Sequence, residues 1–97
     1  MMLKRIGEAI KRNIVFSEIA WDDYLYWQKQ DKKVIQKINK LLKSIDRDGV
    51  MNGEGKPEKL KYRPGDCSRR IDNENRLIYE VCEQQIVVKS CRGHYED

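Results

Sequence analysis

The apolar residues of this 97-residue chain repeat with two different periods, and this change constrains the fold more than any other feature. After Asp31, which can cap a helix, apolar residues recur every three or four positions, as on one face of a helix. These residues are Val34, Ile35, Ile38, Leu41, Leu42 and Ile45. Over residues 76–83 apolar and polar residues alternate instead, which predicts a strand with Leu77, Tyr79 and Val81 on one face. The chain therefore combines helix and sheet within a length that supports one core.

Shorter signals predict the remaining elements. A β-rich run over residues 13–17 ends at Ser17, which can cap a first helix. One face of this helix would carry Trp21, Tyr24, Leu25 and Gln28. A long connection rich in glycine and proline extends from residue 49 to residue 66, with one short strand at 58–61 within it. Later strands are expected at 67–71 and 86–92, on either side of the alternating segment.

The order of these elements predicts an α+β fold. Short turns at 72–75 and 83–85 join consecutive strands, which is typical of an antiparallel meander. We expect a twisted antiparallel β-sheet of four to five strands with two N-terminal helices packed on one face. Residues 13–97 would form a single domain, and residues 1–12 a weakly amphipathic extension that is frayed.

The net charge of +4 is unevenly distributed along the chain. Residues 1–16 and residues 49–70 each carry +3, residues 17–48 carry +1 and residues 71–97 carry −3. A local basic patch suits a polyanion such as nucleic acid, although a solvated surface explains the charge equally well. The sequence shows neither a membrane-spanning run nor a signal peptide, so we expect a soluble cytoplasmic protein with no membrane partner.

The three cysteines, Cys67, Cys82 and Cys91, are odd in number and lack CxxC spacing. We therefore expect no disulfide framework, and His94, the only histidine, leaves too few ligands for a zinc site. Cys82 and Cys91 lie in apolar runs, which predicts small buried side chains in a reducing compartment. Cys67 lacks the partners that a catalytic nucleophile needs.

Three residues could together cleave RNA through its own 2′-hydroxyl. That reaction needs a base for the 2′-hydroxyl proton, an acid for the 5′-oxygen, and cations for the charged phosphorane, but no metal and no cofactor. Glu58 in the loop GKPEKLK, Arg76 at a strand start and His94 after the last strand supply one group of each kind. Each taken singly is more commonly an ordinary surface residue, so the residue types alone leave this activity open.

Five motifs occur in the order SEIAWDDYLYWQKQDKKVIQKINKLLK, GEGKPEKLK, SRRI, NRLIYEV and CRGHY, and the match covers residues 14–95. In this order they resemble the motifs of the YoeB/Txe toxins of bacterial type II toxin–antitoxin modules, within the RelE/ParE superfamily. The resemblance implies a RelE-like fold, similar to that of microbial ribonucleases.

The resemblance also implies roles for individual residues. Glu58 would be the general base, His94 the general acid, and Arg76 the group that stabilises the transition-state phosphate. Tyr95 would orient the phosphate or a nucleotide. The backbone phosphates of RNA would be held by Lys61, Arg69 and Arg70.

By the same resemblance, the protein would be a toxin that cuts mRNA in the decoding site of the bacterial ribosome and so inhibits translation. Its partners would be mRNA, the ribosome, a YefM-like antitoxin and a second copy of itself. A ribonuclease that acts without the ribosome, and a non-catalytic protein that binds the ribosome or the antitoxin, are the alternatives. Two features depart from the family pattern: Cys67 stands where an aromatic residue is common, and Glu96 and Asp97 extend beyond the usual terminus.

Overall fold

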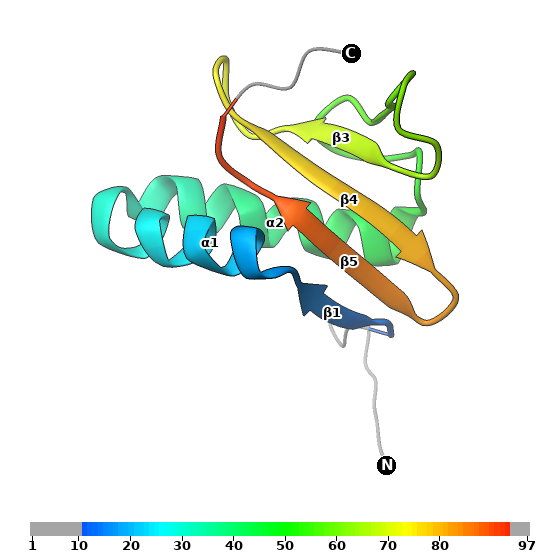
Figure 1. The fold of residues 1–97 in the computed structure, drawn as a ribbon, viewed down its shortest axis with the longest axis horizontal. Coiled ribbons are helices and arrows are strands. Elements are labelled where there is room, and N and C mark those ends of the chain that lie inside the picture. The colour runs from blue at the N-terminus through cyan, green and yellow to red at the C-terminus, as the bar shows by residue number, and fades with distance from the viewer. Residues whose placement is uncertain (1–10, 94–97) are drawn as a thin grey trace.

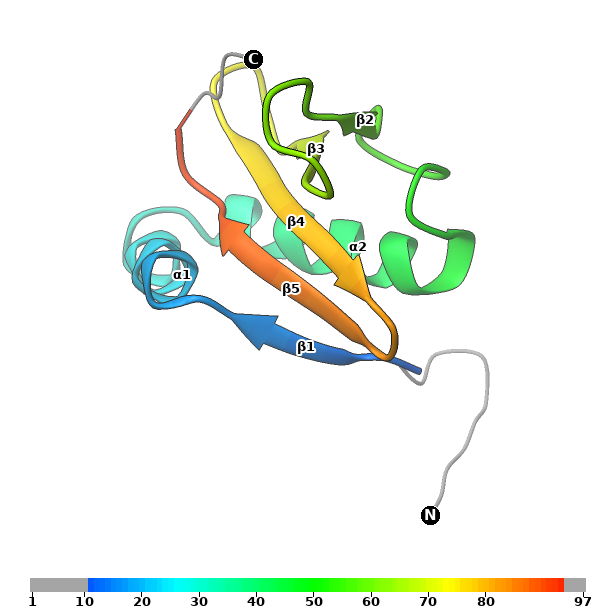
Figure 2. The ribbon, with the colours of Figure 1, turned by 45° about the vertical axis from the view of Figure 1, so that its right-hand side comes forward.

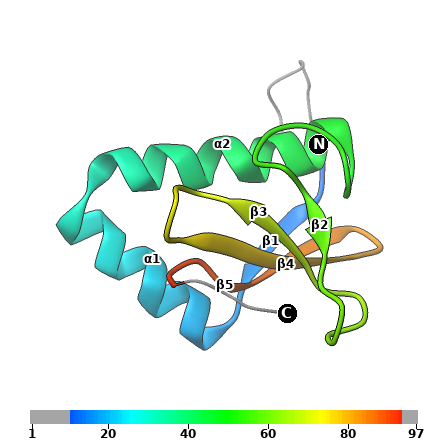
Figure 3. The same ribbon diagram turned by 90° about the horizontal axis from the view of Figure 1, so that it is seen from above.

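The computed structural model describes residues 11–93, in which two helices lie beside one five-stranded sheet (Figure 1). The helices are α1 (Glu18–Gln30) and α2 (Lys32–Asp48). The strands are β1 (Asn13–Phe16), β2 (Glu58–Lys59), β3 (Cys67–Arg70), β4 (Arg76–Cys82) and β5 (Gln85–Ser90). Seen from above, α2 runs along one side of the sheet and α1 lies next to the end of β5 (Figure 3). The predicted α+β class is confirmed.

The sheet has the strand order β1-β5-β4-β3-β2, and one of its four pairings is parallel. The pairs β2–β3, β3–β4 and β4–β5 are antiparallel, as expected from the short turns. The pair β1–β5 is parallel, with Ile14 opposite Ile86, so the expectation of a purely antiparallel sheet is wrong at this edge (Figure 2). A parallel pair needs a long crossover, and the two helices that follow β1 begin that crossover.

The core lies between α2 and the sheet, and it confirms both periods. The buried apolar residues of α2 are Val34, Ile38, Leu41, Leu42 and Ile45. The buried apolar residues of β4 and β5 that belong to the same cluster are Leu77, Tyr79, Ile86 and Val88. Because burying a large apolar side chain stabilises a fold by about 1.5–3 kcal/mol, this cluster supplies much of the drive for folding.

Both helices begin at the predicted capping residues. The Ser17 hydroxyl oxygen accepts the Ala20 N–H at 3.0 Å and donates to the Lys89 carbonyl at 2.9 Å, so it caps α1 and ties it to β5. The Asp31 carboxylate accepts the Lys33 N–H at 3.0 Å and caps α2.

The buried face of α1 differs from the predicted one. Of the predicted residues only Tyr24 is half-buried and the others are exposed, whereas Ala20 is fully buried. Two hydrogen bonds to the backbone of Cys91, just beyond β5, explain why α1 turns a different face toward the sheet than predicted. The Trp27 Nε1–H donates to the Cys91 carbonyl at 2.8 Å, and the Asp23 carboxylate accepts the Cys91 N–H at 2.9 Å.

The end of the N-terminal extension is attached to α2. The backbone N–H groups of Lys11 and Arg12 donate to the Asp46 carboxylate at 2.7 and 3.0 Å, and the Arg12 guanidinium lies 3.6 Å from it. Residues 11 and 12 are thus held against α2, and the prediction of a frayed extension falls mainly on residues 1–10, which lie outside the described part. Neither helix of the described part is long and apolar enough to cross a membrane.

The cysteines divide into two buried thiols and one exposed thiol. Cys67 and Cys91 are buried, and none of the three forms a disulfide. Cys82 is exposed, so its predicted burial is wrong. It is the last residue of β4 and alternates with Val81, which packs against the core, so its side chain points away from the helices.

Thiol labelling of the native protein should therefore modify Cys82 quickly and the other two cysteines slowly. Burial raises the pKa of the Cys91 thiol to about 12 and also raises the pKa of Cys67, so both stay protonated as well as inaccessible. Desolvation and the Glu80 carboxylate raise the pKa of Cys82 too, so the reaction is best run at pH 8.5 with iodoacetamide and peptide mapping. Rapid modification of Cys91 in the folded protein would contradict this packing.

Candidate functional site

The face of the sheet turned away from α2 is here called the outer face. Most of the charged residues of the predicted site lie on it. Directly paired residues in antiparallel strands share a face. Cys67 pairs with Tyr79 and Arg69 with Leu77, and these residues face the helices. The alternate residues form the outer face, and they include Glu58, Ser68, Arg70, Arg76, Ile78 and Glu80.

The register of three strands brings Glu58, Arg70 and Arg76 together on the outer face. Glu58 of β2 lies opposite Ser68 of β3, and Arg70 is two residues further along the same strand. Arg70 lies opposite Arg76 at the start of β4. Such positions place the β-carbons about 5 Å apart for the direct pair, and somewhat less than about 7–8 Å apart for the diagonal pair of Glu58 and Arg70. A long carboxylate and two guanidinium groups can therefore reach one small anion.

The two arginines are a like-charged pair without a carboxylate partner in the part of the chain that the structure describes. Arg70 is exposed and Arg76 is half-buried. The Arg76 Nη1 donates to the carbonyls of Asp72 and Asn75 at 3.0 and 3.2 Å, which fixes its guanidinium at the start of β4. Like charges placed directly opposite destabilise a sheet, and an anion bound between them would relieve the repulsion.

The chain after β5 returns to the beginning of β4. The Gly93 carbonyl accepts the Arg76 N–H at 3.0 Å, and the Gly93 N–H donates to the Asn75 side-chain oxygen at 2.7 Å. Gly93 is the last described residue and is therefore fixed beside Arg76. His94 and Tyr95, the predicted acid and orienting residue, lie outside the described residues.

Lys61 lies in the loop that follows β2, three residues after Glu58. Both side chains are exposed. The Lys61 ammonium lies 5.7 Å from the ring centroid of the neighbouring Tyr62. The structure thus brings Glu58, Arg70 and Arg76 to one face by strand pairing, and joins Lys61 to them through a short loop.

Arg69 does not belong to this group, because its side chain is fully buried on the other face of the sheet. Its Nε–H donates to the Tyr79 hydroxyl at 2.9 Å and its Nη1 to the Ser44 hydroxyl at 3.0 Å. The guanidinium also donates to four carbonyl oxygens, those of Gly49, Val50, Asn52 and Glu54. The prediction that Arg69 holds an RNA phosphate is therefore wrong.

Helix and strand geometry together explain where Arg69 lies. Neighbouring residues of a strand point to opposite faces, so Arg69 and Arg70 cannot both reach the outer face. The acceptors of Arg69 include the first carbonyls beyond the C-terminus of α2, where the helix dipole concentrates negative charge. Arg69 therefore caps α2 and holds residues 49–54 against β3, and this role follows from its burial.

The sequence model of one family, described as the YoeB-like toxin of bacterial type II toxin–antitoxin system, matches residues 16–95. The chain belongs to the YoeB-like toxin family. The described part of the chain accordingly holds the start of the matched region and most of its length. The family resemblance carried by the five sequence motifs is thereby confirmed.

Curated YoeB toxins match this chain over nearly their whole length. Toxin YoeB of Escherichia coli strain K12 is 47% identical over 83 residues, which is 84% of this chain and 98% of the relative. Toxin YoeB of a Synechocystis strain is 46% identical over 84 residues, or 86% of this chain and 96% of the relative. The matched lengths leave only a short part of this chain without a counterpart.

Solved structures of YoeB toxins have the same fold. The YoeB dimer from Staphylococcus aureus matches with a TM-score of 0.84 and 53% identity, covering 88% of this chain and 99% of that chain. The heterotetrameric YoeB–YefM toxin–antitoxin complex from Staphylococcus aureus matches with a TM-score of 0.81 and 54% identity, covering 87% and 98%. The Escherichia coli DinJ–YafQ complex, at 20% identity and a TM-score of 0.70, shares the fold alone.

Sequence reasoning missed an ionic cluster on the outer face of this YoeB-like toxin. Lys89 Nζ lies 2.7 Å from Asp66 Oδ1 and 3.1 Å from Glu80 Oε1, and Arg63 Nη2 lies 2.8 Å from Asp66 Oδ2. Hydrogen bonds to Asp66 and Glu80 raise the pKa of Lys89. The cluster fastens the loop of residues 60–66 to β4 and β5. Alternation along β5 could have placed Lys89 outside, but no sequence pattern pairs it with Asp66.

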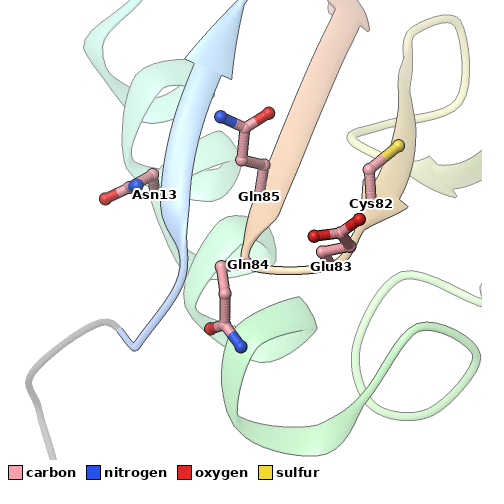
Figure 4. Close-up of a pocket in the computed structure, with 5 residues that line it drawn as sticks. All are labelled: Asn13, Cys82, Glu83, Gln84 and Gln85. Carbon is pink, nitrogen blue, oxygen red and sulfur yellow. The ribbon is translucent and has the colours of Figure 1, made fainter.

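A shallow pocket lies at the opposite end of β4 from Arg76. Its lining residues are Asn13, Cys82, Glu83, Gln84 and Gln85, which surround the turn between β4 and β5 (Figure 4). The lining holds one carboxylate and no cation, so it lacks the positive charge that favours a phosphate. Among residues 11–93 there is also no group of three or more His, Cys, Asp or Glu side chains placed to hold a metal ion.

Proposed function

We propose that this YoeB-like toxin is a ribosome-dependent endoribonuclease that cuts mRNA in the decoding site and so inhibits translation. The observation that carries the proposal is the grouping of Glu58 with Arg70 and Arg76 on the outer face, where the arginines lack a carboxylate partner among residues 11–93. A carboxylate beside two unpaired cations suits the cleavage of a phosphodiester by a neighbouring hydroxyl.

The proposed reaction transfers the phosphoryl group within the RNA. Glu58 takes the proton from the 2′-hydroxyl, the 2′-oxygen forms a bond to phosphorus, and the bond from phosphorus to the 5′-oxygen breaks. His94 gives the leaving oxygen its proton, and the products are a 2′,3′-cyclic phosphate and a 5′-hydroxyl. Arg76 stabilises the charge on the phosphorane, and Tyr95 orients the phosphate.

Binding of the RNA backbone is assigned to Arg70 and Lys61. Arg70 can bind a phosphate through two parallel hydrogen bonds, because its guanidinium is planar and exposed. Lys61 adds a point charge in the loop beyond Glu58. Arg69 has no part in this binding, since its donors are used inside the protein.

We further propose that the chain binds a YefM-like antitoxin and forms a homodimer, acting in the cytoplasm where ribosomes translate. The support is the likeness to the Staphylococcus aureus YoeB–YefM complex and YoeB dimer, at 54% and 53% identity. An acidic antitoxin segment that covers the outer face would occupy the same arginines as RNA.

The purified toxin should truncate an mRNA that is bound to programmed bacterial ribosomes and leave the same mRNA intact without ribosomes. Reading the 5′ ends of the products by primer extension locates the cut relative to the decoding site. Equal cleavage of naked RNA would favour the ribosome-independent ribonuclease. Growth arrest by His94→Gln at the wild-type level, with no cleavage by either protein, would favour a non-catalytic binding protein.

A further inference from the structure

Tyr62 is the most exposed large apolar or aromatic side chain of the described part, with 73% of its surface accessible. Its position is nevertheless fixed by its neighbours on both sides. Leu60 is buried, and its N–H donates to the Asp66 carbonyl at 2.9 Å. Asp66 in turn donates its own N–H to the Arg63 carbonyl at 3.0 Å. The loop is therefore a closed turn that presents one aromatic ring to solvent.

The ionic cluster described above holds this turn against the sheet. Asp66 is nearly buried, and its carboxylate pairs with Arg63 of the loop and with Lys89 of β5. A positive φ of 90° at Gly65 allows the chain to pass close to the Glu80 carboxylate. Because the backbone of the turn is already held, binding of a planar partner would cost mainly the rotamer freedom of the ring itself.

The charge around Tyr62 indicates the chemistry of that partner. Lys61 and Arg63 flank it in the sequence, and the Lys61 ammonium lies 5.7 Å from the ring centroid. Glu58 precedes Tyr62 by four residues, so their α-carbons lie no more than about 14 Å apart. Arg63 is paired with Asp66, whereas the ammonium of Lys61 lies beside the ring. An exposed aromatic ring beside a lysine, close in sequence to the proposed phosphate-binding face, suits single-stranded nucleic acid, whose bases stack on such rings.

We propose that Tyr62 stacks on a base of the mRNA close to the scissile phosphate and so holds the substrate for cleavage. This inference rests on the proposed ribonuclease function and adds a nucleobase contact to it. Stacking requires the ring and not the hydroxyl, and it tolerates any base because each base presents a flat face. Tyr62 would therefore strengthen binding without selecting a codon.

Changing Tyr62→Ala should lower kcat/KM on programmed ribosomes about tenfold, whereas Tyr62→Phe should keep the wild-type value. Ile19→Ala is the matched control, because Ile19 is 66% exposed on α1 and should leave cleavage unchanged. All three variants should unfold at the wild-type temperature, since each alters an exposed side chain. Equal losses from Tyr62→Ala and Tyr62→Phe would overturn the stacking role.

An mRNA with a single abasic nucleotide identifies the base. Moved through the positions around the cut, the abasic site should slow the wild-type toxin at one position and add no further loss to Tyr62→Ala there. Additive losses at every position would show that Tyr62 contacts something other than a base and would overturn the proposal. If the wild-type toxin cleaves no mRNA on ribosomes, the proposed function itself fails. If the wild-type toxin cleaves and the Tyr62→Ala variant cleaves at the same rate, only the role of Tyr62 fails.

Discussion

Glu58→Gln should slow mRNA cleavage on the ribosome about a hundred- to ten-thousandfold while the protein keeps its fold. The amide has nearly the shape of the carboxylate but cannot take a proton from the 2′-hydroxyl. Glu58 is exposed on a two-residue strand, so its replacement disturbs no buried contact. Single-turnover cleavage, with the toxin in excess over programmed ribosomes, measures the chemical step.

The control for this variant is Glu83→Gln. Glu83 is an exposed carboxylate in the turn between β4 and β5, at the end of β4 remote from Arg76. The Glu83→Gln protein should therefore cleave mRNA at the wild-type rate. Binding of the Glu58→Gln protein to ribosomes should also stay close to wild type, because the change removes a base and no cation. A Glu58→Gln rate within a factor of three of wild type would exclude Glu58 as the general base.

Arg69→Met should lower the free energy of unfolding by about 3–5 kcal/mol, a large share of the stability of a small domain. The loss arises because two hydroxyl groups and four carbonyl groups lose the donor that they share. Arg69→Lys should recover only part of this loss, since one ammonium cannot reach acceptors on α2, β4 and residues 49–54 together. Urea unfolding at a fixed protein concentration measures the change.

The adjacent arginine supplies the opposite result. Arg70→Met removes an exposed side chain, so the free energy of unfolding should change by no more than about 0.5 kcal/mol. Its mRNA cleavage should nevertheless fall, because Arg70 is assigned to phosphate binding. An unfolding midpoint for Arg69→Met equal to that of wild type would show that the buried hydrogen bonds contribute nothing to stability.

The sequence periods predicted the parts of the fold that depend on apolar burial. The spacing of Val34, Ile38 and Ile45 identified the buried face of α2, and the alternation of Leu77 and Tyr79 identified that of β4. The buried face of α1 was predicted wrongly, because a hydrogen bond between Asp23 and the backbone of Cys91 decides it. A polar residue on the buried side of a helix has no signature in a hydrophobic pattern.

The candidate site was predicted in part. Glu58, Arg70 and Arg76 reach one face because strand alternation and register place them there. The sequence alone did not show that these side chains converge, because a loop of residues 60–66 separates β2 from β3. Alternation could also have removed Arg69 from the RNA-binding set. The exposure of Tyr62 could not be predicted, because the loop that carries it is held by an ion pair between Asp66 and Lys89. No sequence motif contains both of these residues.

The twin arginines also bear on how accurately β3 can be aligned during folding. A slide of β3 by one residue would carry Arg70 into the place of Arg69, so the hydrogen-bond acceptors beside α2 cannot by themselves reject the misaligned strand. The residues after the strand can. Ile71 is buried, and the slide would bring the Asp72 carboxylate into its place. The slide would also break the hydrogen bonds that the Asp72 carboxylate accepts from the N–H groups of Glu74 and Asn75, which close the turn. The boundary between Ile71 and Asp72 therefore helps to set the register of β3 during folding.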